Sequence, residues 1–156
     1  MYSVKGLNCK ITTDTMYSNI KSLKQNICAQ IYSHKCGFNA VYHTRRANNE
    51  NVGNTLNDFV HDYGIPDHLT YDGAPVQVGS RTKFQDIIRR NRIKTHVSAP
   101  RRPNENSAEG SICEVKRKWY NLQSKKKIHG RLWDYGMSWI CETGNVTQNI
   151  ATAAPH

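Results

Sequence analysis

Three acidic residues that lie far apart in the sequence constrain the fold of this chain most strongly. Asp14 lies in a β-branched run that predicts a strand, Asp72 follows a second such run, and Glu109 opens a long helical pattern after a polar loop. Clustered carboxylates repel one another unless a divalent cation holds them, and Mg²⁺ or Mn²⁺ prefers oxygen ligands of this kind. If the three residues form one site, two strands and the start of a helix must meet in space.

Each of these residues also has an ordinary interpretation on its own. Asp72 is followed by Gly73, and Asp-Gly is a common turn dipeptide. Glu109 taken alone fits a solvated helix surface. Asp14 is harder to explain in this way, because Asp is depleted in strands and a half-buried carboxylate needs a partner. The functional hypothesis therefore depends on all three residues coming together in one chain.

The charge of the chain favours a polyanionic partner. Lys and Arg number 22 against 12 acidic residues, which gives a formal net charge of +10 over 156 residues. Nucleic acid is the commonest partner of such a chain, although the same surplus of positive charge also fits a surface that only keeps the chain soluble. No run approaches the roughly 18 apolar residues of a membrane span, and the N-terminus lacks the apolar stretch of a secretory signal. We expect no membrane segment and no secretion.

The cysteines predict free or buried thiols in a reducing compartment. There are five of them, an odd number, and no two form a Cys-x-x-Cys pair. Their spacing does not support a zinc site.

The hydrophobic periodicity predicts an α/β protein with the element order β-β-β-α-β-α-β-α-α. A helix whose apolar face ends at Tyr63 is followed within a few residues by the strand that leads to Asp72, and such a crossover implies parallel pairing. We predict a mixed five-stranded sheet, three antiparallel strands and then two parallel ones, flanked by helices. The expected strands cover residues 11–16, 27–33, 38–44, 68–72 and 93–97, and the expected helices cover 52–63, 84–91, 108–125 and 131–142.

The helix over residues 108–125 shows one apolar stripe and one basic position. At 100° per residue, Lys116 lies only about 20° from Glu109, two turns further along. A cation there is well placed to meet a phosphate backbone that leads into a metal site, and its ordinary interpretation is a solvated side chain. The predicted stripe consists of Ile112, Val115, Trp119 and Leu122. The last helix is expected to bury Leu132, Tyr135, Trp139 and Ile140.

Several segments, taken in order, match a known family. They are residues 13–18, 64–74, 93–96, 106–109, 114–119 and 132–135. The chain resembles the catalytic core of retroelement integrases, most closely those of Copia-type long-terminal-repeat retrotransposons, over roughly residues 9–145. The resemblance implies an RNase H-like fold and a D,D,E active site. On it, Asp14, Asp72 and Glu109 are the catalytic residues and also the ligands of two Mg²⁺ or Mn²⁺ ions.

The resemblance also implies a reaction and its partners. The expected activity is that of a DNA recombination enzyme, a transferase and endonuclease that processes the 3′ ends of element DNA and joins them to target DNA. Lys116 matches a position that contacts DNA near the reactive end in such enzymes. The further expected DNA contacts are Arg117, Lys118, Asn106, Arg101 and Arg102. A homo-oligomer is expected, located in the nucleus after a cytoplasmic particle stage.

The expected domain organisation is a catalytic core over residues 1–145 and a short polar C-terminal tail over residues 146–156. The zinc-binding N-terminal module and the C-terminal DNA-binding domain of the family are absent and are expected in a longer polyprotein. The chain also departs from the family at Glu105, where Gln is frequent, and this negative charge near the DNA path would weaken binding. Two alternatives remain open. One is a decayed or co-opted integrase fragment that binds nucleic acid or assembles with partners, and the other is a different RNase H-like nuclease or transposase.

Overall fold

The computed structural model describes the backbone of residues 6–72, 82–97 and 107–153. Side chains are described within these ranges, except for those of residues 6–8, 107–109 and 146–153. Within these ranges no helix combines the length and the apolar character that crossing a membrane requires.

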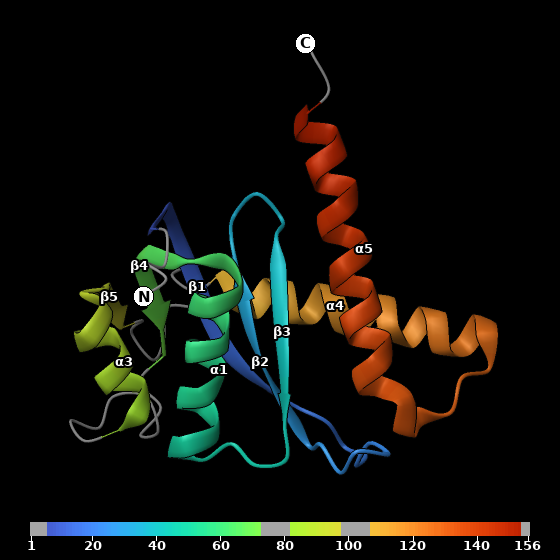
Figure 1. Ribbon diagram of the computed structural model, residues 1–156. Coiled ribbons are helices and arrows are strands. Elements are labelled where there is room, and N and C mark those ends of the chain that lie inside the picture. The colour runs from blue at the N-terminus through green and yellow to red at the C-terminus, as the bar shows by residue number, and fades with distance from the viewer. Residues whose placement is uncertain (1–5, 73–81, 98–106, 154–156) are drawn as a thin grey trace.

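One five-stranded sheet forms the centre of the molecule, in the order β3-β2-β1-β4-β5 (Figure 1). The first three strands pair antiparallel, whereas β4 pairs parallel with β1 and β5 pairs parallel with β4. This arrangement confirms the predicted mixed sheet. The strands are β1 (Gly6–Tyr17), β2 (Cys28–Ser33), β3 (Asn39–Thr44), β4 (Ile65–Tyr71) and β5 (Lys94–Val97).

Helices cover both faces of the sheet, and the core is divided accordingly into two clusters. The helices α1 (Asn49–Tyr63) and α3 (Lys83–Asn91) pack on one face, where they bury Leu56 and Phe84 against strand residues such as Leu69. The helix α4 (Ser107–Lys126) packs on the other face, together with α5 (Trp133–Ala153), which also runs beside β3 (Figure 1). The result is a three-layer α/β domain.

Gly64 joins α1 to β4 without any further loop. Its φ of 112° lies in the region that favours glycine, and its N–H donates to the carbonyl oxygen of Val60 at 2.9 Å. The helix ends at Tyr63, as predicted, but the strand begins at Ile65 and includes Pro66, earlier than the predicted residue 68. Proline is tolerated there because the pairing of β1 with β4 shifts register between Leu7 and Lys10, next to the partner of Pro66.

The predicted buried face of the last helix was wrong for its two large aromatic residues. Tyr135 is 51% exposed and Trp139 is 56% exposed, although Ile140 is buried as expected. The helix begins at Trp133, after a short 3-10 turn over Gly130–Leu132, and continues to Ala153 instead of ending near Glu142. The buried face at helical spacing consists of Trp133, Met137, Ile140 and Cys141.

The polar segment between β1 and β2 fastens the start of α5 to the sheet. Asn26 Nδ2 donates to the Asp134 carboxylate at 3.0 Å, and the backbone N–H of Leu23 donates to the carbonyl oxygen of Arg131 at 3.0 Å. Burial alone would raise the pKa of Asp134, but hydrogen bonds from Ser22, Asn26 and the Tyr135 N–H lower it on balance. A buried carboxylate is thereby kept ionised and paired.

A second polar contact joins β3 to α5. The His43 Nε2 and the Ser138 Oγ lie 2.8 Å apart, and the imidazole packs edge-on against the ring of Trp133. Burial disfavours the charged imidazolium and lowers the pKa of His43 to about 4. The contact is therefore made by the neutral ring at pH 7.

The crossing of α4 and α5 predicts a strong effect of one methyl group. A Cβ added at Gly136 would lie 2.2 Å from Trp119 Cζ3, so the Gly136→Ala variant must displace a buried ring. We expect a loss of about 1–3 kcal/mol in the free energy of unfolding, measured by urea denaturation. In the control Gly144→Ala, on the same helix, the added Cβ meets no atom within 4 Å and should stabilise by up to about 1 kcal/mol. Equal stabilities of the two variants would contradict the close crossing.

His43 predicts a loss of stability in mild acid. Its pKa is lower in the folded protein than the usual 6.5, so the unfolded chain takes up the proton first as the pH falls. The stability of the fold is therefore complete above about pH 6.5 and declines between about pH 6.5 and 4. Between pH 7 and 5 the parent should lose about 2 kcal/mol more than His43→Gln in urea unfolding. The exposed His61→Gln serves as control and should follow the parent.

Candidate active site

The parallel pairing of β1 with β4 brings Asp14 and Asp72 to neighbouring positions. Thr12 is the partner of Thr70, and continuing this register by two residues places Asp14 opposite Asp72, the first residue after β4. Asp14 is half-buried and Asp72 is exposed at the carboxyl end of its strand. The register therefore brings two residues that are 58 positions apart in the sequence to the same level, Asp14 within β1 and Asp72 just past the end of β4.

The alternation of side chains places both aspartates on the same face of the sheet. Ile11, Leu69 and Tyr71 belong to the core beneath α1 and α3, whereas Met16 belongs to the core beneath α4 and α5. Because successive strand residues face opposite ways, Asp14 shares the face of Met16, and Asp72 follows Tyr71 on that same side. Both carboxylates thus belong to the face that α4 covers.

Glu109 lies in the first turn of α4, the helix that packs on this face. Ile112 and Val115 are buried in one cluster with Met16 of β1, and Figure 1 shows α4 beginning behind β1. The Glu109 side chain lies outside the described residues. The structure therefore places the helix as the prediction requires, and the contribution of Glu109 to a site stays a prediction.

The described donor atoms fit a hard cation, but they do not by themselves complete a metal site. Asp14 and Asp72 supply carboxylate oxygens, and Asp14 Oδ1 also accepts the backbone N–H of Thr15 at 2.8 Å. Among the side chains that the structure describes, no group of three His, Cys, Asp or Glu residues could hold a metal ion. The catalytic and metal-binding roles of Asp14, Asp72 and Glu109 accordingly stay predictions.

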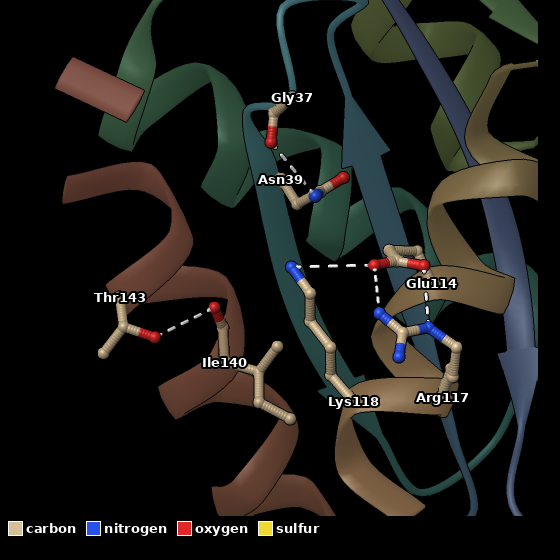
Figure 2. Close-up of polar contacts among 7 residues, drawn as sticks. All are labelled: Gly37, Asn39, Glu114, Arg117, Lys118, Ile140 and Thr143. Carbon is tan, nitrogen blue, oxygen red and sulfur yellow. Dashed lines mark hydrogen bonds and ion pairs between the residues drawn. The ribbon is translucent and has the colours of Figure 1, made fainter. Parts of the chain in front are cut away.

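The basic residues of α4 are in different electrostatic environments. Arg117 binds Glu114 through two hydrogen bonds, of 3.1 and 2.7 Å, and Lys118 lies 3.9 Å from the same carboxylate (Figure 2). The Arg117 guanidinium holds the pKa of Glu114 below its usual value. Lys116, in contrast, forms no ion pair with any described residue and is half-buried beside Met16 and Trp119. Of the three cations, Lys116 is the best placed to meet an external phosphate.

The predicted apolar stripe of α4 is confirmed. Ile112, Val115 and Trp119 are buried, and Leu122 packs against the same cluster. Sequence reasoning missed the pairing of Glu114 with Arg117, although their i, i+3 spacing is a signal for it. The predicted DNA contacts Arg101, Arg102 and Asn106 lie outside the described residues.

Comparison with known proteins gives a likeness in structure rather than in sequence. No protein-family model matches the chain, and no curated protein matches it. The BIV integrase catalytic core domain matches with a TM-score of 0.65 at 13% identity, over 84% of this chain and 79% of the other. The HTLV-2 integrase catalytic core domain in complex with magnesium, in its trimeric form, matches with a TM-score of 0.64 at 17% identity. The match covers 89% of this chain and 87% of the other.

The chain has the fold of the retroviral integrase catalytic cores. This confirms the RNase H-like fold that the resemblance implied. A chain of the simian T-cell lymphotropic virus intasome also matches, with a TM-score of 0.67 at 16% identity over 83% of this chain. The present chain spans only 47% of that longer protein. At these identities the likeness establishes the fold, and the assignment to the Copia type still rests on the resemblance of the short segments.

The geometry of α4 predicts that Lys116 contributes to DNA binding. Removing its charge in Lys116→Ala should weaken binding to duplex DNA and flatten the slope of log affinity against log salt by about 0.9, the value of one phosphate contact. The measurement is fluorescence anisotropy over a salt series. Lys126→Ala, which removes an exposed cation near the end of the same helix, is the matched control and should change the slope less. An unchanged slope for Lys116→Ala would leave Lys116 as a solvated helix residue.

Proposed function

We propose that this chain is an integrase catalytic core, a metal-dependent polynucleotidyl transferase that acts on DNA. The observation that carries the proposal is the parallel register of β1 and β4, which pairs Thr12 with Thr70, two residues before Asp14 and Asp72 respectively. The fold shared with integrase cores and the net charge of +10 support the same function. The finer proposal is that the chain processes the 3′ ends of element DNA and joins them to target DNA, as part of a Copia-type retrotransposon.

The proposed site consists of Asp14, Asp72 and Glu109, each with a distinct structural position. Asp14 is held within a strand, Asp72 ends the neighbouring strand, and Glu109 lies in the first turn of the covering helix. These carboxylates would hold two Mg²⁺ or Mn²⁺ ions, and the ions would supply activation of the attacking oxygen and stabilisation of the leaving oxygen. Lys116 would hold the phosphate backbone along α4, two turns from Glu109.

The proposed cofactor and assembly have parallels among the structurally similar proteins. The HTLV-2 integrase core domain was solved in complex with magnesium in a dimeric form and in a trimeric form. We propose divalent-metal use and homo-oligomerisation for this chain as well. DNA is the proposed partner, with further integrase modules in a longer polyprotein and a nuclear site of action.

The proposal predicts that Asp72→Asn abolishes metal-dependent strand cleavage and leaves the fold intact. Asn keeps the size of Asp but removes the charge that binds the cation. The assay is Mn²⁺-dependent disintegration of branched DNA, with the melting temperature measured in parallel. We expect loss of activity, an equal or higher melting temperature in the absence of metal, and loss of the stabilisation that Mn²⁺ gives the parent.

The matched control is Asp67→Asn, which removes an exposed carboxylate from the other end of the same strand. It should retain cleavage and stabilisation by Mn²⁺. If Asp72→Asn cleaves as well as the parent, Asp72 is a turn residue and the site assignment is wrong. A parent that shows neither cleavage nor stabilisation by Mn²⁺ would favour a co-opted fragment that binds nucleic acid without catalysis.

A further inference from the structure

A groove between α4 and α5 combines an exposed tryptophan with two lysines. Its volume is about 500 Å³, and α4 contributes Lys118, Leu122 and Lys125 to its lining. On the other side α5 contributes Trp139 and Ile140. On α4 the groove begins at Lys118, nine residues after Glu109. At 1.5 Å per residue, this is about 14 Å along the helix from the proposed active site. The groove is therefore a separate surface.

Trp139 is the exposed one of three tryptophans. It is 56% exposed, whereas Trp119 and Trp133 are 3% and 2% exposed. Trp139 is not part of the core, because the buried face of α5 is formed by Trp133, Met137 and Ile140. An aromatic ring beside apolar side chains offers a surface on which a flat ring can stack.

The cations around the groove are available to an anion. Lys118 and Lys125 are exposed and lie seven residues apart, on one side of α4. Lys118 lies 3.9 Å from one acidic residue, Glu114, but Arg117 binds that carboxylate more closely, at 2.7 and 3.1 Å (Figure 2). Figure 2 also shows Lys118 on the side of α4 that faces Ile140 and Thr143 of α5. Positive charge therefore flanks the aromatic ring.

We propose that this groove binds single-stranded nucleic acid, with a base stacked on Trp139 and phosphates held by Lys118 and Lys125. An aromatic platform within a basic groove is the combination that binds single strands without sequence preference. A duplex fits less well, because its bases are stacked on one another and do not reach a side chain on a protein surface. The binding requires no metal and none of the three carboxylates, so it does not depend on the proposed catalysis.

The test uses a short fluorescein-labelled oligothymidylate and the full chain, in EDTA. We expect the parent to bind with quenching of its tryptophan fluorescence, and Trp139→Ala to bind about fivefold to a hundredfold more weakly. Trp139→Phe keeps a stacking ring and should recover most of the affinity. Lys118→Gln and Lys125→Gln should each flatten the salt dependence by about 0.7 on the logarithmic scale.

Two controls separate this site from its alternatives. Tyr135→Ala removes an aromatic residue that is 51% exposed on the same helix but does not line the groove, and should bind as the parent does. Asp72→Asn should also bind normally, so a failure of catalysis would leave this proposal standing. Equal affinity of Trp139→Ala and the parent would overturn it. So would Trp139-dependent binding of a polyglutamate peptide in the absence of oligothymidylate binding, which would assign the groove to an acidic protein partner.

Discussion

The parallel pairing of β1 with β4 is the constraint on which the rest of the structure depends. It requires a crossover through α1, and it aligns Thr12 with Thr70. Asp14 and Asp72 each follow two residues later, and so they lie at the same height along the neighbouring chain segments. The buried residues Ile11 and Leu69 hold the register, because they share the core beneath α1 and α3. Any shift by one residue would expose these side chains and turn the polar ones inward. The apolar core therefore determines the positions of the carboxylates.

The helix α4 serves both the core and the charged surface. Ile112, Val115 and Trp119 fasten one side of it to the sheet, and the close approach of Trp119 to Gly136 fixes the crossing of α5. The basic residues then occupy the remaining sides in two groups, Lys116 beside Met16 of β1 and Lys118 with Lys125 near Trp139. The packing of one buried stripe thus decides which cations can act together.

The sequence predicted the sheet well because its signals are local and agree with one another. Strand alternation, the apolar helix face that ends at Tyr63 and the short crossover each indicate one topology, and the pairing confirms it. The face of α5 was predicted poorly because Tyr135 and Trp139 were placed in the core for their size, whereas burial follows the helical spacing from Trp133. The convergence of Glu109 with the aspartates stays a prediction that rests on the resemblance, since no local pattern reports a contact between distant segments.

The direct junction at Gly64 has an evolutionary consequence. Helix α1 ends and β4 begins with a single residue between them, and Asp72 follows at a fixed count along the strand. An inserted or deleted residue in this stretch would turn the carboxylate of Asp72 to the opposite side of the sheet. Point substitutions can be accommodated there, but changes in length cannot. Related chains that keep this chemistry should therefore vary at the exposed positions of this stretch, such as Asp67, while keeping its buried residues Leu69 and Tyr71 and its residue number.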